Sequence, residues 1–189
     1  MKVKIKDITI TCTAIYRKVK YIRFELTYDH LNLIIPEKTT QSIEDIIKIK
    51  ENYLYKKIKQ YQQLESNTTN LELNTLSDVN LRKLVDKFIK IYEKKLNVSV
   101  NRLQYRQTKY KWGSCSIRGN ITLSYDLKYL PEKLIKYIVY HELTHLIVLK
   151  HNTEFFNIIK KEFPDYISLD EELKLYEFNI FKTKKRGEY

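Results

Sequence analysis

The residues with the clearest chemical potential form the segment His141-Glu142-Leu143-Thr144-His145. The chain has four histidines, and three of them lie between positions 141 and 151. Residues i and i+4 of an α-helix share one face, so His141 and His145 can direct two imidazoles to one point. Zinc binds neutral imidazole nitrogen, and a catalytic zinc keeps three protein ligands and one open position. The segment therefore predicts a metal-binding helix.

Glu142 is the predicted general base. It lies about 100° around the helix from His141, at the edge of the face that carries both histidines. A carboxylate there can accept a proton from water activated by the metal, which lowers the pKa of that water to about 7. In an H-E-x-x-H motif, the two histidines bind the metal and the glutamate acts as the general base in this way. The alternative is a core helix with two histidines, but burying such groups without a shared partner is costly.

His151 is the predicted third ligand, which would complete a site for one Zn²⁺ per chain. On a continuous helix it would lie roughly 120° away from His145. The chain must therefore leave the helix, and we expect the break near Leu149-Lys150. Asn152 is a suitable N-cap for a new helix from Thr153, which agrees with a break before it.

Two glutamates compete with His151 for the third position. Glu154 and Glu162 follow it closely, and zinc also accepts two histidines and one glutamate. Metzincins have the same histidine spacing with a glycine at the turn. Here the corresponding residue is Val148, so the turn must have a different geometry.

A hydrolase also needs a group that stabilises a developing oxyanion. Arg106, Lys109 and Tyr166 are candidates by their chemistry alone. Cys115 is a weaker candidate for a nucleophile, because the histidines that could activate it are already assigned. We expect Cys115 to be a small packing residue.

Strands and amphipathic helices must position these residues. Alternating apolar residues in the first 35 positions predict strands with a break near Lys6-Asp7, followed by a hairpin. Ser42 begins a predicted helix to about residue 64, the polar residues 66–77 form a loop, and a second helix spans the apolar positions from 81 to 96.

The segment from residue 98 to 125 returns to alternating strands and precedes the metal-binding helix. It contains the only tryptophan, Trp112, and two of the three glycines. Gly119-Asn120 is typical of a hairpin turn, and Gly113 indicates that another backbone passes close by. A last helix is expected from Ser168, where a capping box begins, with Tyr166 in the preceding loop.

Composition sets the broad class. The 189 residues fit one domain with or without a small appendage. The formal net charge is +12, which attracts polyanions, but only the tail 182–186 is a compact basic cluster. Two cysteines form no disulfide framework, and we find neither a secretory signal nor an apolar stretch that would span a membrane. We therefore expect a cytoplasmic protein.

Several motifs together resemble the YgjP-like family of predicted metal-dependent hydrolases, zincin-like proteins related to SprT-type metallopeptidases. The resemblance is densest between residues 98 and 166. The matching motifs are Arg106-x-x-Lys109-x-x-Trp112-Gly-Ser-Cys-Ser116, Gly119-x-Ile121-x-Leu123-Ser124, Pro131, Tyr137, His141-Glu-Leu-Thr-His145-Leu and His151-Asn-Thr-Glu-Phe155-Phe.

This resemblance implies an α+β fold of zincin type, with a small, mostly antiparallel sheet packed on the active-site helix. It implies zinc on His141, His145 and His151, with Glu142 as the base. It also places the strand Trp112–Ser116 beside the cleft, which makes Trp112 a candidate substrate contact. We assign residues 1–97 to N-terminal strands and two scaffold helices, and residues 98–189 to the catalytic part, and we expect both parts to form one compact unit.

Three functions are compatible with this site. The first is a metallopeptidase acting on peptide or protein substrates, because an exposed strand beside a cleft suits the addition of an extended peptide. The second is a nucleotide phosphoanhydride hydrolase that uses the same zinc. The third is a SprT-like protease or binding module that is recruited to nucleic acid through its basic charge.

Overall fold

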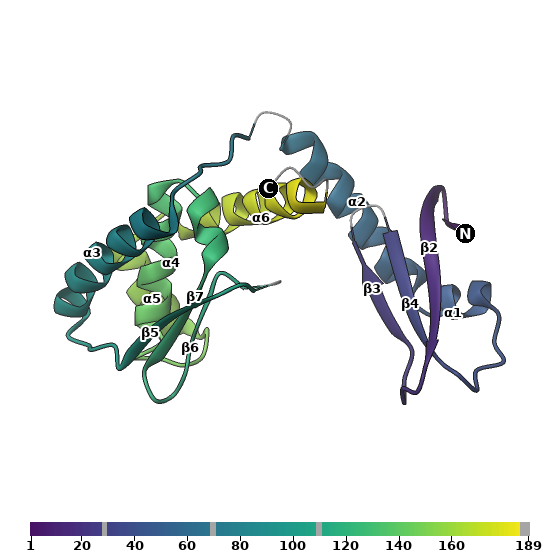
Figure 1. The fold of residues 1–189 in the computed structure, drawn as a ribbon, viewed down its shortest axis with the longest axis horizontal. Coiled ribbons are helices and arrows are strands. Elements are labelled where there is room, and N and C mark those ends of the chain that lie inside the picture. Colours follow the sequence, from purple (N-terminus) through teal and green to yellow (C-terminus); the bar gives the residue numbers. More distant parts are fainter. Residues whose placement is uncertain (28–29, 69–70, 109–110, 186–189) are drawn as a thin grey trace. The chain divides into compact units, whose positions relative to one another are not determined.

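A computed structural model of the chain describes residues 1–27, 30–68, 71–108 and 111–185. The elements are mixed helices and strands, so the predicted α+β class is confirmed. Contacts divide the chain into two compact units, residues 1–67 and residues 68–189 (Figure 1). In the described part of the chain, no helix is long and apolar enough to cross a membrane.

The first unit is a four-stranded sheet with two helices. Its elements are β1 (Lys2–Ile5), β2 (Ile8–Arg17), β3 (Arg23–Leu26), β4 (His30–Pro36), α1 (Ile43–Ile49) and α2 (Glu51–Asn67). The strand order is β1-β2-β4-β3, in which β2 and β4 are parallel and the other pairs are antiparallel. The predicted break at Lys6-Asp7 is the turn between β1 and β2, and the predicted second hairpin is β3–β4.

Alternation along the strands gives this sheet one apolar face. Side chains on that face pack against the inward residues of both helices, namely Ile46, Ile47, Leu54 and Ile58. Ser42 caps α1 as expected, and its side chain accepts a hydrogen bond of 3.1 Å from the Asp45 amide. The single predicted helix is in fact two, because the helix is interrupted at Lys50.

The second unit contains the remaining elements. They are α3 (Asp78–Leu96), β5 (Arg102–Arg106), β6 (Gly113–Cys115), β7 (Asn120–Ser124), the 3₁₀ helix η1 (Tyr125–Tyr129), α4 (Glu132–Thr144), α5 (Thr153–Glu162) and α6 (Tyr166–Lys185). The sheet order is β5-β7-β6, with β5 parallel and β6 antiparallel to β7. Gly119 has φ +72° in the predicted turn between β6 and β7, a conformation that glycine adopts without strain.

Helix α4 is the centre of the second core. Most of its side chains are buried, and the helix packs against α3, β6, α5 and α6. Helix α3 packs directly on α4, so it belongs to the same compact unit. We expected one compact unit with a division after residue 97, whereas the contacts divide the chain into two units after residue 67.

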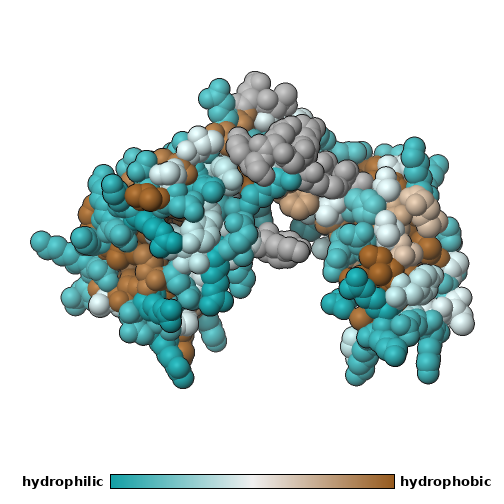
Figure 2. Space-filling view, in the orientation of Figure 1, coloured by the Kyte–Doolittle hydropathy of each residue, from teal (hydrophilic) through white to brown (hydrophobic). Residues whose placement is uncertain are grey.

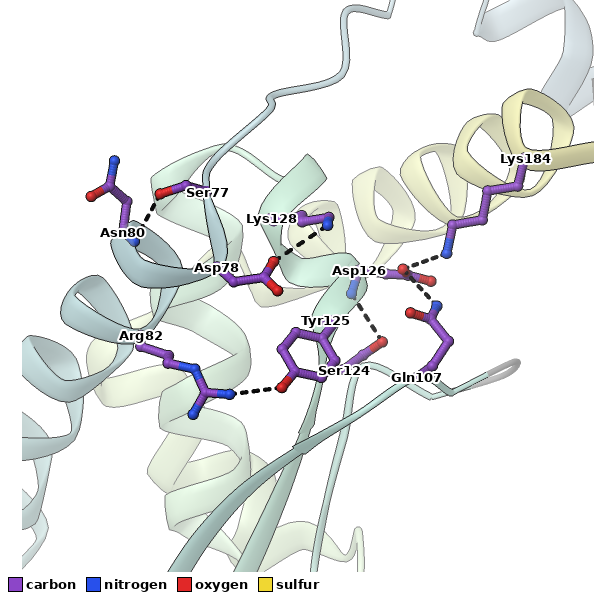
Figure 3. A network of polar contacts seen from close by, with 10 residues as sticks. All are labelled: Ser77, Asp78, Asn80, Arg82, Gln107, Ser124, Tyr125, Asp126, Lys128 and Lys184. Carbon is purple, nitrogen blue, oxygen red and sulfur yellow. Dashed lines mark hydrogen bonds and ion pairs between the residues drawn. The ribbon is translucent and has the colours of Figure 1, made fainter. Parts of the chain in front are cut away.

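A polar network joins η1 to the elements around it (Figure 3). The Asp126 carboxylate accepts hydrogen bonds from Gln107, which follows β5, at 2.9 Å and from Lys184 on α6 at 2.5 Å. The Arg82 guanidinium on α3 donates to the Tyr125 hydroxyl at 2.7 Å. The network ties α3, α6 and the end of β5 to the 3₁₀ helix that leads into α4. The visible face of each unit is mostly hydrophilic (Figure 2).

The packing of α5 against α3 generates a stability prediction at Glu162. Its carboxylate accepts hydrogen bonds from Tyr92, at 2.9 Å, and from Lys95, and it lies 3.7 Å from the Lys136 ammonium. Burial alone would raise the pKa of Glu162, but the Lys95 and Tyr92 hydrogen bonds and nearby positive charge lower it overall. The ionised form therefore stabilises the fold.

We predict that Glu162→Gln lowers the free energy of unfolding by about 1–3 kcal/mol at pH 7. Because the folded-state pKa is lowered, the wild-type advantage should disappear as the pH falls through that pKa. Urea unfolding at pH 7 and in acid would measure both effects. Glu171→Gln, at an exposed position on α6, is the matched control and should change stability little. An equal loss at both pH values would contradict the role of the charge.

Candidate metal centre

The C-terminal end of α4 brings two of the histidines together. The helix starts after Pro131, whose carbonyl accepts from the amides of Leu134 and Ile135. It ends at Thr144, so His145 is the C-cap, yet His145 keeps a helical backbone with φ −66° and ψ −17°. The i, i+4 relation is therefore preserved, and the ring centroids of His141 and His145 lie 5.1 Å apart.

The chain leaves the helix earlier than expected. We predicted a break near residues 149–150, but the turn already begins at His145. The Val148 amide bonds to the Thr144 carbonyl, and no residue from 145 to 151 has a positive φ. Val148 is thus tolerated where metzincins have glycine. Asn152 then caps α5 as predicted, accepting from the Phe155 amide at 3.0 Å.

This turn brings His151 to the other two histidines. The Nε2 atoms of His141 and His151 lie 3.0 Å apart, and one ring nitrogen of each histidine falls within 4.8 Å of the others. Burial lowers the pKa of His141 to about 3, with smaller contributions from His145 and His151. Burial also lowers the pKa of His145. Neutral imidazoles that converge on one point are the donor set that a transition metal requires.

Two contacts orient the imidazoles. His145 Nδ1 lies 3.1 Å from the Val148 carbonyl oxygen, which makes Nδ1 the donor and leaves Nε2 free to bind a metal. The Phe155 ring, fully buried, has its centroid 4.7–4.9 Å from the centroids of all three imidazoles. Phe155 therefore limits how far the imidazole rings can tilt. This role could not be predicted from the sequence, because Phe155 has the pattern of an ordinary apolar helix position.

Glu142 is buried beside the histidines without a full set of partners. Its side chain is 6 % exposed, and no hydrogen-bond partner reaches Oε2. Burial raises the pKa of Glu142 to about 8, although the charge of Lys111 opposes this shift. A buried carboxylate oxygen without a partner is costly in a purely structural role and is available to a bound group.

Gly113 on β6 provides the space for that carboxylate. A Cβ atom at Gly113 would lie 2.7 Å from Glu142 Oε1 and 2.8 Å from its Cδ, closer than real contacts allow. We expected a second backbone at Gly113, and this was wrong. The close neighbour is the side chain of Glu142, so Gly113 is required by the proposed base itself.

The two rival ligands lie elsewhere. Glu154 is exposed in the first turn of α5, and Glu162 is held by Tyr92 and two lysines. Within the described ranges, the three histidines form the one group of histidine, cysteine or acidic side chains that could hold a metal.

A cavity of about 420 Å³ opens in front of the histidines and Glu142. Trp112 lines it, as does Cys115, whose pKa burial and Glu142 raise to about 11, so the thiol stays protonated. Its other lining residues are Lys111, Gly113, Ser114, Tyr137, Ile138, Leu149, Asp170 and Leu173. Tyr137 belonged to the family motifs without an assigned role, and Asp170 carried no sequence signal, because nothing local places α6 beside α4.

The three residues that were candidates for the oxyanion have different outcomes. Arg106 is exposed at the end of β5 and contacts Gln104, outside the cavity lining. Tyr166 is the first residue of α6, where we expected a loop, and its ring packs 5.4 Å from that of Phe156. Lys109 lies outside the described residues.

The fold and this site together are those of a metal-dependent hydrolase, in which a helix carries His-Glu-x-x-His and a third histidine returns after a turn. A family model described as YgjP-like, metallopeptidase domain, matches residues 65–176, which is more than half of the chain. The chain therefore belongs to the YgjP-like metallopeptidase domain family, as the motifs indicated. The matched range lies almost entirely within the second unit.

Among solved structures, the metallopeptidase zymogen abylysin of Pyrococcus abyssi is similar to this chain at 24 % sequence identity. The match covers 53 % of this chain and 93 % of that one, with a TM-score of 0.40. A comparison with curated proteins gave no match.

The contact between Gly113 and Glu142 generates a second prediction. Gly113→Ala should displace the carboxylate and lower the free energy of unfolding by about 1–3 kcal/mol, the usual cost of overpacking. Metal content should stay near the wild-type level, because the added methyl group faces Glu142. Ile117→Ala, in the exposed turn of the same hairpin, is the control for a change in that region. Unchanged stability and unchanged hydrolysis in Gly113→Ala would contradict the tight contact.

Proposed function

We propose that the chain is a zinc-dependent metallopeptidase in which Glu142 is the general base. The single observation that supports this most strongly is the convergence at one cavity of three imidazoles and a buried carboxylate oxygen without a partner. Membership of a metallopeptidase domain family already makes the chain a metal-dependent hydrolase that acts on peptides or proteins.

His141, His145 and His151 are the proposed ligands. Neutral imidazole suits zinc as well as copper, iron and nickel, but three histidines beside a cavity form a common catalytic zinc site. The ion would polarise the scissile carbonyl and lower the pKa of the attacking water. The Val148 carbonyl supports the site by holding His145 in the tautomer that presents Nε2.

Glu142 would accept the proton of the attacking water and pass it to the amine leaving group. Its burial suits this cycle, because a raised pKa brings the carboxylate close to the pKa of an activated water. Lys111, which also lines the cavity, would offset negative charge that develops on the substrate. We keep Lys109 as a proposal from the sequence for the same role.

The edge strand β6 favours a peptide substrate. It is the outer strand in the order β5-β7-β6, and all three of its residues line the cavity. The unpaired main-chain groups of an edge strand can bind an extended peptide as one more strand. Trp112, directly before β6, is the proposed contact for a substrate side chain.

The cavity does not favour the two alternatives. A triphosphate needs several cations, but the lining pairs one lysine, Lys111, with the carboxylates of Glu142 and Asp170. In the basic tail, Lys184 is bound to Asp126. Nucleic-acid binding through this tail stays a prediction, to be tested by the salt dependence of binding to a DNA fragment.

Metal content tests the proposed ligands. Wild-type protein should hold about one zinc per chain, and His151→Ala should lose most of it, since two imidazoles bind zinc much more weakly than three. Glu154→Ala is the matched control and should keep its zinc. Mass spectrometry of protein purified without added metal would measure the content. Full zinc content in His151→Ala would contradict the three-histidine site.

Glu142→Gln separates catalysis from metal binding. The variant should retain its zinc and lose roughly 10²–10⁴ in the rate of hydrolysis, because the amide cannot accept the proton. The rate on unfolded casein, measured beside zinc content, gives both quantities. If the zinc is lost together with the activity, Glu142 is a structural residue and not the base.

A further inference from the structure

Helix α6 also contributes to the wall of the cavity. Asp170 and Leu173 lie one turn apart on this helix, and both line the same cavity as the histidines. Asp170 is half-buried there, while Leu173 is buried. A carboxylate thus borders the space that a substrate would occupy, at a position unrelated to the H-E-x-x-H motif.

A hydrogen bond from α4 holds the Asp170 carboxylate in place. The Tyr137 hydroxyl donates to Asp170 Oδ1 at 2.8 Å, and Tyr137 itself is only 1 % exposed. The ring of Tyr137 lies one turn before His141, with ring centroids 6.1 Å apart. The carboxylate is therefore oriented beside the proposed metal centre and is not a mobile surface group.

Asp170 has no cationic partner, unlike three other half-buried acids of this unit. Glu162, Glu172 and Asp126 each lie within ion-pair distance of a lysine. Across the part of the chain that the structure describes, no lysine, arginine or histidine is within 4.0 Å of Asp170. Although the protein has 35 basic and 23 acidic residues, this carboxylate is left without a compensating cation and is therefore open to a cationic ligand.

The other residues of the cavity suit a cation on an apolar stem. Leu173 and Leu149 offer apolar surface, and the Trp112 indole lines the same cavity. Long basic side chains bury their methylene groups while the charged head meets a carboxylate or an aromatic face. An acidic substrate group would instead be repelled from this wall.

We propose that Asp170 determines specificity by binding a cationic group of the peptide substrate. This inference rests on the proposed function and names the class of substrate: peptides with a positive charge close to the scissile bond. Two sources supply the same chemistry, namely the side chain of lysine or arginine and the amino-terminal ammonium group. The first would make the enzyme an endopeptidase with basic preference, and the second would make it an aminopeptidase.

Binding is the first test, because it does not depend on turnover. The zinc-loaded Glu142→Gln protein is titrated with acetylated, amidated alanine hexapeptides that carry one lysine at each position in turn. The matched peptides carry norleucine, and a third probe is hexa-alanine with a free amino terminus. Trp112 is the only tryptophan and lines the cavity, so its fluorescence reports occupancy.

We expect at least one cationic peptide to bind about tenfold or more tightly than its norleucine match, which is the usual strength of a charge-assisted hydrogen bond. Adding Asp170→Asn should remove this difference, because asparagine still accepts the Tyr137 hydrogen bond but lacks the charge. Asp165→Asn, which removes an exposed charge just before α6, should leave it unchanged. The lysine and free-amine peptides identify which source is used.

Cleavage of the same peptides by protein with Glu142 intact separates the two proposals. Cleavage without any preference for a positive charge, or a preference that survives Asp170→Asn, would overturn the role of Asp170 and leave the peptidase intact. Peptides that bind with the charge preference but are never cleaved would overturn the peptidase chemistry and leave the subsite. Equal binding of lysine and norleucine peptides at every position would overturn the subsite whether or not cleavage occurs.

Discussion

The second unit depends on one demanding constraint, which is that polar groups must converge inside an apolar core. His141, Glu142 and His145 lie on α4, the most buried helix of the unit, or at its C-cap, and the exposed His151 joins them from the following turn. Burying such groups without partners costs several kcal/mol, so the surrounding structure has to hold them in one arrangement. The close contact of Gly113 with Glu142 and the packing of Phe155 against the imidazoles meet this requirement, because they restrict the positions that these polar groups can take.

The same constraint explains why the chain turns where it does. A helix continued beyond His145 would carry His151 away from the cluster, so the turn is needed for the third imidazole. The carbonyl of Val148 in this turn accepts a hydrogen bond from His145, and Asn152 then starts α5. Because α5 also carries Phe155, one change of direction supplies both the third histidine and the ring that packs against all three.

The sequence predicted what is local and missed what is long-range. Spacing alone placed His141 and His145 on one helix, and Asn152 indicated the cap of the next. The helix ends several residues before the predicted break. Hydrogen bonds close the turn there without a glycine, so no residue marks its position in the sequence. Gly113 was recognised as a close approach, but its neighbour lies 29 positions away in sequence and could not be read from periodicity. Asp170 had no signal at all, since only tertiary packing brings α6 to the cavity.

The charge distribution of the cavity follows from the same packing. Lys111, just before β6, is close enough for its charge to oppose the rise in the pKa of Glu142, whereas Asp170 lines the cavity from α6. A substrate that lies along β6 would therefore meet the positive charge of Lys111 and the negative charge of Asp170 in the same cavity. An extended peptide with one cation can interact favourably with both Lys111 and Asp170, while a polyanion can interact favourably only with Lys111. The overall excess of lysine thus says little about the substrate, because the local balance in the cavity has the opposite emphasis.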